Sequence, residues 1–553
     1  MIKNFVTAAG LLSLATAAAA TTWNVDASAC DDTTGTPAFC TIGAAIATAA
    51  AGDTIQIVAA DYAENLFIDK SLTLLGANAG NCARDGEFPW QRSSGRSDET
   101  NLLPTADAAI RIAPGTDHVT IDGFTIQAAG VMGIAINSET DATVADVQIL
   151  NNVFQNSDET LVRGQGVHLV GWEIACNFAD AWNGVQKAAV EVRNGEMRDS
   201  RLHDNTIQGT FSSMSAGFDF DRVNRTEIRG NWIGYLSGSA IHAAGGSGAL
   251  WVEGNKLYYA GYGLLLETGS WDAAHVDIGG VVFENNLISE MSEHGLELAP
   301  TASASFAGRA TSGLYVANND YTENYGLIAY DGSLVKLTFD TQGGAPGPLH
   351  VYRNQVQITG TLGGESPRTV GAVGGGHALA IGGYAPADIQ LHNNTLIGID
   401  AEQLQGMAQP TAVMMITDSA TVGRITGNSL ISAQCNDLDG FGDGISARDE
   451  VTGEVSGLPA GIDVVLVNNC VDHQYNLGVN YGDEASFATI QAAHNWWGCA
   501  EGPGHPGCAD VAGLVDVSEP LAAEPVNCDA APLFEDGFEI GSTARWSATE
   551  SAN

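Results

Sequence analysis

The sequence predicts an all-β solenoid, a parallel β-helix, from three observations. A short phrase recurs, in which an apolar residue, two variable residues and an Asn precede one variable and one apolar residue. Copies of the phrase lie roughly 25 to 40 residues apart, and a period in this range indicates a solenoid. Apolar residues alternate on both sides of the Asn, which is typical of strands and not of helices.

The recurring Asn residues mark the corners of the predicted coils. Clear copies of the phrase run from Ile149 to Phe154 and from Ile228 to Ile233, and Asp122 takes the same role one register earlier. Asn tolerates the left-handed backbone of a tight corner, and its amide can bond to the Asn of the next coil. The frame therefore predicts one ladder of stacked side chains: Asn152, Asn177, Asn205, Asn231, Asn255, Asn286, Asn319, Asn354, Asn394, Asn428, Asn469 and Asn495.

With these repeats, the chain resembles the right-handed parallel β-helix (pectin-lyase-like) superfamily, which includes pectate lyases and related polysaccharide enzymes. Many members carry such an Asn ladder, and the resemblance extends over most of the chain, from about residue 41 to about residue 520. It implies a right-handed coil in a secreted bacterial protein. It does not select one activity, because this fold carries several chemistries and some non-enzymes.

The two ends of the chain look like targeting and tail segments. Residues 1–20 resemble a signal peptide, with Lys3 before an apolar run and small residues up to Ala20. A transmembrane anchor is the alternative, which the short, Ala-rich run disfavours, and no later segment has eighteen uninterrupted apolar residues. The predicted organisation is a signal peptide at 1–20, the β-helix domain at 21–514, and a linker with a C-terminal tail at 515–553.

Part of this tail, residues 533–547, resembles a short segment of exported proteins from some Gram-negative bacteria. We therefore expect a secreted or cell-surface protein of a Gram-negative bacterium. A solenoid must cover the open ends of its core. The small amphipathic segment 42–51 is the predicted helical cap at the N-terminal end, and Trp496 and Trp497 are placed to seal the other end. The polar segment 81–104 reads as a loop that leaves the solenoid and returns.

The charge balance limits the partners. The formal net charge is −43, from 65 acidic against 22 basic residues. A nucleic acid partner is excluded on this basis, because phosphate binding needs Lys and Arg. A neutral or Ca²⁺-bridged polysaccharide, or a cell-surface glycan, is the expected partner of a monomer without a transmembrane segment in its mature chain.

Nine Cys residues in an exported chain predict disulfides. The spacing favours Cys30 with Cys40 and Cys499 with Cys508, and Cys435 with Cys470 would join nearby coils. Three cysteines remain, Cys82, Cys176 and Cys528, so at least one thiol is unpaired. We interpret all nine Cys residues as structural.

Aligned second strands of the coils place one column of side chains on the outer face, because the flanking apolar residues face the core. Adjacent coils lie about 4.8 Å apart, so neighbours in the column approach hydrogen-bonding range. A second column, two residues later, contains Arg193, Asp221 and Glu267. The first column reads His168, Glu191, Asp219, His242, Leu265 and Glu297, and later coils place Ile328, Ser446 and Asn480 in it.

These columns predict an acid–base site with Glu191, Asp219, His242, His168, Arg193 and Asp221 as catalytic residues. Two adjacent carboxylates disfavour joint ionisation, so one is expected to keep its proton, as glycoside hydrolysis requires. His168 and His242 would move protons near neutral pH. A lyase would instead need a base and a cation beside the uronate carboxylate, roles open to Arg193 or Lys187 and a carboxylate-bound Ca²⁺. Further candidates for substrate binding are Trp182, Tyr262, Glu267 and Glu297.

Each candidate has a plainer interpretation. The column can be the solvated polar face that every solenoid has. The catalytic motifs of the resembled enzymes are also missing: neither Asn-Thr-Asp with Gly-His-Gly, as in polygalacturonases, nor Asp-Pro-His, as in mannuronan epimerases, is present. Tyr235 and Tyr259 share a register and suit an internal corner stack as well as sugar binding. Asp437, Asp439 and Asp443 in a Gly-rich loop are candidate ligands for Ca²⁺, although an acidic turn explains them better.

Two functions remain open from the sequence. The first is cleavage of an extracellular polysaccharide, by hydrolysis or by elimination, which the His and carboxylate column favours. The second is a non-catalytic adhesive solenoid that binds glycans or cells, which the missing motifs favour.

Overall fold

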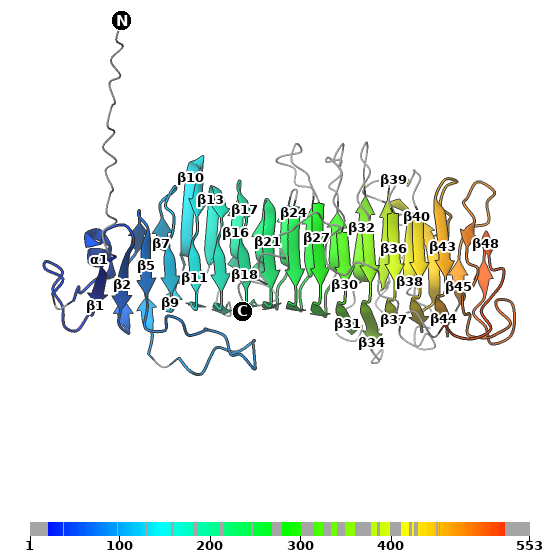
Figure 1. Cartoon of the computed structure of the whole chain (residues 1–553), viewed down its shortest axis with the longest axis horizontal. Helices are drawn as coiled ribbons and strands as arrows, with labels where there is room; N and C mark the ends of the chain where they lie inside the picture. Colours follow the sequence, from blue (N-terminus) through cyan, green and yellow to red (C-terminus); the bar gives the residue numbers. More distant parts are fainter. Residues whose placement is uncertain are drawn as a thin grey trace, which may run out of the picture.

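The chain folds into a long three-sided solenoid (Figure 1). A computed structural model describes residues 20–525 apart from 37, 97, 129, 156–159, 181–185, 210–213, 245–246, 268–278, 293, 300–313, 325–332, 340–348, 360–377, 384–387, 399–410, 420–422, 425–429, 450–451, 453 and 475. The predicted signal peptide and most of the C-terminal tail therefore lie outside the described residues. Among those described, no helix is long and apolar enough to cross a membrane.

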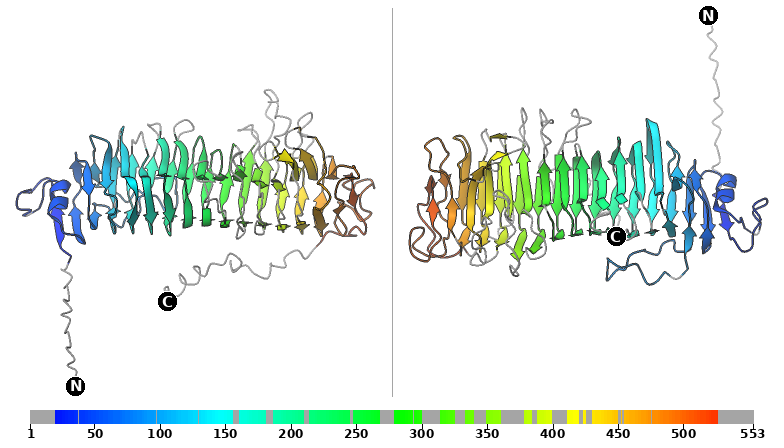
Figure 2. Two further views of the ribbon diagram at one scale, coloured as in Figure 1. Left: turned by 90° about the horizontal axis from the view of Figure 1, so that it is seen from above. Right: turned by 180° about the vertical axis from the view of Figure 1, so that it is seen from behind.

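Each coil contributes parallel strands to three stacks, which we call rows 1, 2 and 3 (Figure 2). Row 1 consists of β4 (Leu66–Ile68), β7 (Ala108–Ile112), β10 (Met132–Ala145), β13 (Val162–Val170), β16 (Gln186–Arg193), β20 (Met214–Phe220), β23 (Ser239–Ala244), β26 (Leu264–Glu267), β29 (His294–Ala299), β32 (Ser333–Phe339), β35 (Leu379–Gly383), β38 (Thr411–Ser419), β42 (Asp443–Asp449), β45 (Leu477–Asn480) and β47 (Val511–Ala512).

Row 2 consists of β1 (Thr22–Val25), β2 (Asp53–Ile57), β5 (Leu72–Leu75), β8 (Thr120–Asp122), β11 (Gln148–Leu150), β14 (Glu173–Ala175), β18 (Arg201–His203), β21 (Val223–Arg229), β24 (Ser247–Glu253), β27 (Gly279–Glu284), β30 (Leu314–Ala317), β33 (Leu349–Tyr352), β36 (Asp388–His392), β40 (Leu430–Gln434), β43 (Asp463–Val467), β46 (Ile490–Gln491) and β48 (Val515–Asp516). Strand pairing thus continues to the end of β48.

Row 3 consists of β3 (Ala60–Tyr62), β6 (Thr100–Leu102), β9 (Phe124–Gln127), β12 (Val153–Gln155), β15 (Phe178–Asp180), β19 (Thr206–Gln208), β22 (Trp232–Gly234), β25 (Lys256–Tyr258), β28 (Leu287–Ser289), β31 (Asp320–Asn324), β34 (Gln355–Thr359), β37 (Thr395–Ile397), β41 (Asp437–Asp439) and β44 (Cys470–Asp472). Two short strands complete the set: β17 (Glu196–Arg198), which pairs with β13 and β21, and β39 (Gly423–Arg424), antiparallel to β38.

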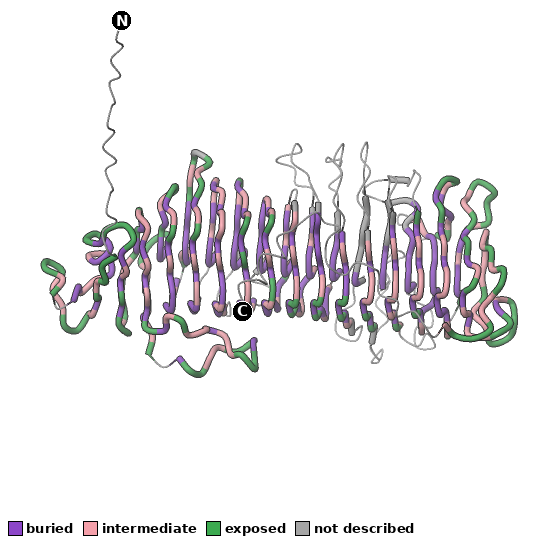
Figure 3. Tube along the Cα trace, in the orientation of Figure 1, coloured by how far each residue is buried: buried purple, intermediate pink, exposed green. Residues whose placement is uncertain are grey.

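The core lies between the three rows, and buried residues alternate with more exposed ones along many of the strands (Figure 3). From β12 onward, the second residue of each row 3 strand points inward, as with the fully buried Ile233 and Ile288. The predicted cap is confirmed as helix α1 (Ile42–Thr48), whose buried face includes Ile42 and Ile46. The carboxylate of Glu64 accepts hydrogen bonds from the first amides of α1, where the helix dipole favours a negative charge.

The Asn ladder is present with two corrections. Asn394 donates to Asn436, so Asn436 is the next rung and the predicted Asn428 is not; residues 425–429 lie outside the described part. The left-handed residue is not the ladder Asn but its predecessor, for example Asn151 (φ 55°) or Cys176 (φ 56°). The predecessor turns the chain, and this turn aims the Asn side chain inward, where it can bond along the stack.

The cysteine pairing matches the prediction in part. Cys30–Cys40 and Cys499–Cys508 are disulfides as predicted. Cys470 is a free, buried thiol, so the predicted Cys435–Cys470 bond is wrong. A further disulfide joins Cys82, in the loop that leaves the solenoid, to Cys176 at a ladder corner.

Candidate functional site

The predicted outward column of row 1 exists in the predicted register over five coils. Glu191 on β16 pairs with Asp219 on β20, and Asp219 pairs with His242 on β23. Leu265 and Glu297 follow on β26 and β29. The inward neighbours of these residues are apolar and buried, which orients the column outward, as with Val190 and Val192 beside Glu191.

His168 does not belong to this column. Its register partner is Glu196 on β17, and Arg163 occupies the position beside Glu191. Gly166 adopts a positive φ of 65° within β13, and the two halves of this long strand pair with different partner strands. An alignment of its second half with the shorter row 1 strands therefore places His168 in the wrong register. The His168 imidazole contacts the carboxylates of Asp141 at 3.0 Å and Glu196 at 3.6 Å. Lys336, and not the predicted Ile328, follows Glu297 in register, and Ile328 lies outside the described residues.

Arg193 is the centre of the site, because its guanidinium contacts three carboxylates. Nε donates to Glu191 Oε1 at 2.9 Å, and one terminal nitrogen donates to Asp221 Oδ1 at 3.2 Å. The other terminal nitrogen donates to Asp219 Oδ2. We call these four residues the Arg193 cluster. Its carboxylate residues are at most 6% exposed, so their charges need this cation.

Burial acts to lower the pKa of Arg193, but the charge of Asp219 and the hydrogen bonds to Glu191 and Asp221 outweigh burial and raise it. The guanidinium therefore stays charged throughout the accessible pH range. The two acids predicted to face each other directly are instead bridged by a permanent cation. This arrangement differs from an acid pair that shares a proton.

Asp219 also holds His242. Its Oδ1 lies 2.9 Å from Nδ1 of the imidazole. An ionised carboxylate can only accept, so this contact places a proton on Nδ1. An acid–base residue oriented by a second, buried carboxylate is a recurring catalytic arrangement.

Two residues that the sequence interpretation missed complete the surroundings of Glu191. The hydroxyl of Thr160, fully buried, donates to Oε2 at 3.2 Å. Arg163 Nε lies 3.2 Å from the same oxygen, as a charge contact without hydrogen-bond geometry. Arg163 could have been found by aligning Val162-Arg163-Gly164 with Val190-Glu191-Val192, which preserves the in–out alternation.

Sequence and structure comparisons bear on the family. Residues 105–278 match the family model described as a right handed beta helix region. This chain is a right-handed parallel β-helix. The matched segment includes the Arg193 cluster and His242. No curated protein sequence matches this β-helix.

Solved structures similar to the β-helix include DFA-IIIase from Arthrobacter chlorophenolicus A6, with TM-score 0.36, 12% identity, and coverage of 70% of this chain and 84% of that chain. The catalytic unit of the GH87 alpha-1,3-glucanase from Streptomyces thermodiastaticus strain HF3-3 has TM-score 0.36, 13% identity, and coverage of 75% and 65%. The Dettilon tailspike protein has TM-score 0.36, 12% identity, and coverage of 70% and 63%. Such low identities and TM-scores say nothing about the activity of this chain.

The predicted substrate-binding residues are spread over the β-helix. Glu297 is 9% exposed and lies in the column beyond Leu265. Glu267 follows Ala244 in the second column, two residues along from Leu265. The ring of Tyr262 lies 6.1 Å from that of His294, at the entry to β26. Trp182 and the side chain of Lys187 are not among the described parts of the chain.

The predicted corner stack of tyrosines is present. The rings of Tyr235 and Tyr259 stack with centroids 5.5 Å apart and planes 15° apart, and Tyr258 meets Tyr259 edge-on at 4.3 Å. Burial, a hydrogen bond to Tyr259 and the charge of Glu290 raise the pKa of Tyr258 to about 12. All three tyrosines remain partly exposed, at the corner between row 3 and the row 1 strands that carry His242 and Leu265.

The predicted Ca²⁺ ligands do not come together. Asp437 and Asp439 lie on β41 in row 3, where Asp439 contacts His473 at 3.1 Å. Asp443 lies on β42 in row 1, and its buried carboxylate accepts from Arg448 at 2.8 Å and from Asn480 at 3.0 Å. The turn between β41 and β42 sends the side chains into different rows, so this sequence segment does not form a cation loop.

One other group of potential ligands occurs in the described ranges: Cys499, Glu501 and Cys508. The two sulfur atoms form a disulfide, so neither is a thiolate that could bind a metal.

Proposed function

We propose that this β-helix protein cleaves a neutral extracellular polysaccharide by glycoside hydrolysis at the outer face of row 1. The observation that carries the proposal is the Asp219–His242 pair beside the Arg193 cluster. The imidazole of His242 would exchange a proton with the glycosidic oxygen, and Asp219 would orient the ring and stabilise its charged form. Glu191, in the coil next to Asp219, would be the second carboxylate that stabilises positive charge on the sugar ring.

The electrostatics favour hydrolysis over elimination. A lyase acting on a uronate needs a cation that can leave its protein partners and meet the substrate carboxylate. Arg193 already contacts three carboxylates, and Arg163 contacts Glu191. Three carboxylates against these two guanidinium groups leave the cluster with one excess negative charge. The net charge of −43 adds a further repulsion of polyuronates.

A second candidate function is a non-catalytic solenoid that binds glycans or cells. This function is favoured because the carboxylates of the site already have hydrogen-bond and charge partners within the protein. Glu191 is held by Thr160, Arg163 and Arg193, and Asp221 accepts from the Asn194 amide as well as from Arg193. A fully paired cluster of this kind also serves to tie neighbouring coils together.

Export to the cell surface or the medium is part of the proposal. Its support is the signal-like residues 1–20 together with the disulfides of the mature chain, such as Cys82–Cys176, which persist in oxidising compartments. A Ca²⁺ requirement is retained as a question for experiment, and the arrangement of Asp437, Asp439 and Asp443 gives it no support.

The test is product release from neutral and uronic polysaccharides, with and without Ca²⁺. The mature protein is expected to release reducing ends without unsaturated products. His242→Gln and Asp219→Asn are expected to lower kcat by about 100-fold or more, because each removes the oriented acid–base group. Unsaturated products from the wild type would instead show elimination.

A matched control separates catalysis from the loss of one charge. Asp199 and Arg225 form a comparable ion pair at an exposed site, with oxygen–nitrogen distances of 2.6 and 2.7 Å. Asp199→Asn removes one carboxylate there and is expected to keep wild-type activity. If the wild type releases no product from any polysaccharide, the binding solenoid is the better account.

A further inference from the structure

Row 2 carries a line of aromatic side chains on its outer face, on a side of the solenoid that the Arg193 cluster does not occupy. In successive coils, Trp251, Val282, Tyr315 and His350 occupy one register position on β24, β27, β30 and β33. These strands follow one another along the middle of the solenoid (Figure 1). The residues before and after each aromatic residue that are described, such as Leu250 and Val252, are fully buried, so the line faces outward.

Two of the rings stack on each other directly. Tyr315 and His350 stack with centroids 4.9 Å apart and planes within 4°. Both rings and Trp251 are partly exposed, whereas Val282 fills the space between Trp251 and Tyr315 and is 8% exposed. Coils repeat at about 4.8 Å, so the strip offers one apolar surface per coil. We call these four residues the row 2 strip.

Two carboxylates and a tyrosine lie in the line of residues beside the strip. Two residues further along each strand, the outward positions are Glu253, Glu284, Ala317 and Tyr352. Glu253 and Glu284 are register neighbours, and both are partly exposed. None of the eight outward positions in these coils carries Lys or Arg.

We propose that the row 2 strip is a glycan-binding face that takes a linear, uncharged polysaccharide along the solenoid axis. A pyranose ring presents a flat face of C–H groups, which packs on aromatic rings, and an edge of hydroxyl groups, which can donate to carboxylates. The two partners lie side by side at Trp251 and Glu253, Glu284 follows in the next coil, and Tyr315 and His350 continue the line of rings. The net charge of −43 repels a polyanion, which favours an uncharged polymer.

This inference deepens the proposed function, since it assumes a glycan partner and adds a second, separate contact with the same chain. A long polysaccharide that reaches both row 1 and row 2 would be held by more than one surface. Binding to two linked sites raises the effective concentration of the polymer at the cluster.

The test is affinity electrophoresis of the mature protein in gels with neutral polysaccharides or with polygalacturonate. The double variant Trp251→Ala/Tyr315→Ala is expected to weaken binding of the neutral polymer by about tenfold or more, because the sugar rings lose the aromatic rings on which they pack. Trp251→Phe/Tyr315→Phe is expected to retain binding, because the rings remain. Trp90→Ala removes an exposed tryptophan, 45%, from the loop outside row 2 and is the control.

Equal retardation of the Trp251→Ala/Tyr315→Ala variant and the wild type would overturn the inference, as would tighter binding to polygalacturonate. Thermal unfolding of each variant checks that the solenoid is intact. Product release by the wild type is scored separately on the same polysaccharides. Retardation without product would contradict the proposed hydrolysis and support binding at the row 2 strip. Product release together with retardation that does not depend on the strip would support hydrolysis and contradict binding at the strip.

Discussion

A single ladder Asn makes more hydrogen bonds than its size suggests. Asn255 Nδ2 donates to Ile228 O at 2.8 Å and to Asn286 Oδ1 at 3.1 Å. Its Oδ1 accepts from both the backbone and the side-chain nitrogen of Asn231 at 3.0 Å. Asn255 itself is fully buried. Removing it would leave several buried groups without partners, which costs more than the bonds are worth in water.

We expect Asn255→Ala to destabilise the protein by about 3 kcal/mol, because several buried donors and acceptors lose their partners together. The measurement is the urea midpoint followed by circular dichroism. Lys256→Ala, at the exposed neighbouring position, should change the free energy of unfolding by less than about 0.5 kcal/mol. Similar effects of the two substitutions would show that the ladder is not a main source of stability.

The residue before each ladder Asn carries the strain of the corner. Gly254 has a φ of 64°, and an added Cβ would meet nothing within 4 Å. Gly254→Ala is therefore a test of backbone conformation alone, and we expect a loss of about 1 kcal/mol. Gly254→Asn should cost less, as the equivalent Asn285 already has a φ of 55°. Equal midpoints for the Ala and Asn variants would contradict this assignment.

The sequence shows the ladder but not the detail of its corners. Spacing alone locates the rungs, because the apolar residues on both sides fix the frame. It does not separate Asn428 from Asn436, since both have apolar residues at the required distances. The left-handed residue was also hidden, because the position before the rung accepts Gly, Asn, Cys, Asp, Arg and His alike.

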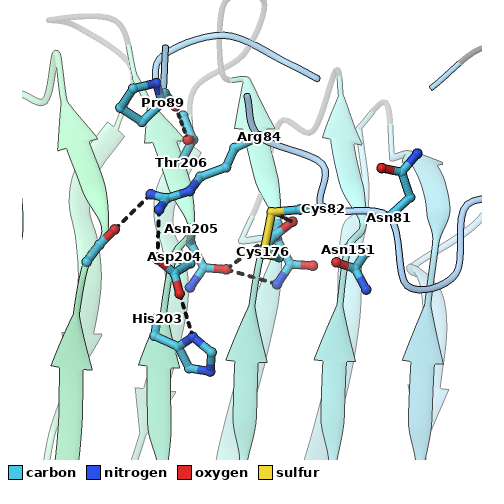
Figure 4. The surroundings of a disulfide bond; sticks show 12 residues. Asn81, Cys82, Arg84, Pro89, Asn151, Cys176, His203, Asp204, Asn205 and Thr206 are labelled. Atoms are coloured by element: carbon cyan, nitrogen blue, oxygen red, sulfur yellow. Dashed lines mark hydrogen bonds and ion pairs between the residues drawn. A yellow bond between two sulfur atoms is a disulfide. The ribbon is translucent and has the colours of Figure 1, made fainter. Parts of the chain in front are cut away.

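At the scale of elements, the segment 81–99 lies along the outside of the coils that contain Cys176 and Asp204 (Figure 4). The disulfide anchors it at Cys82, and Arg84 donates to Asp204 Oδ1 and Gly230 O, each at 2.7 Å. Further along, Thr206 donates to the carbonyl of Pro89. The segment thus ties together coils that are not its neighbours in sequence.

We expect Cys82→Ala/Cys176→Ala to lower the free energy of unfolding by about 4 kcal/mol, because the bond closes a long loop in the unfolded chain. The sequence separation of the two cysteines is 94 residues. The measurement is the urea midpoint under non-reducing conditions. Cys30→Ala/Cys40→Ala, which opens a loop with a separation of 10, should have a smaller effect. The reverse order would contradict the role given to the segment 81–99.

The neighbouring His203 predicts a pH dependence. Hydrogen bonds to Asp204, and secondarily to Glu173, raise the pKa of His203 above 6.5 against the opposing effect of burial. A raised folded-state pKa stabilises the fold below the unfolded-state pKa, and this contribution is lost as the pH rises through the folded-state pKa. The urea midpoint should therefore decrease as the pH is raised above about 6.5, the pKa of an unperturbed His. His203→Gln should reduce this slope, and an unchanged slope in the variant would count against the assignment.

Strand length decided how much of the site could be predicted. Where row 1 strands are short and evenly patterned, as in β20, β23 and β26, alternation fixed the register and placed Asp219 and His242 correctly. β13 bends at Gly166 and pairs with two strands, so alternation misplaced His168. The contacts of Arg193 were beyond prediction, because they depend on side-chain conformations across two coils.

At the scale of the whole molecule, a solenoid is stable only as a stack with closed ends. Each coil buries its apolar residues against the next, so both end coils would expose core and unpaired strand edges. At the C-terminal end, the predicted seal is present in part. Trp497 is 1% exposed, whereas Trp496 is partly exposed, and β47 and β48 add further pairing beyond them.

At the N-terminal end, α1 covers the core with Ile42 and Ile46, which are at most 5% exposed. Ile42→Asp/Ile46→Asp places two charges against this core and should displace the helix. The uncovered strand edges would then pair with other copies, so we expect concentration-dependent oligomers by light scattering after size exclusion. Ala47→Asp, on the exposed side of the same helix, should behave as the wild type. A variant that stays at the wild-type mass at every concentration would mean that the edge is protected by something other than the cap.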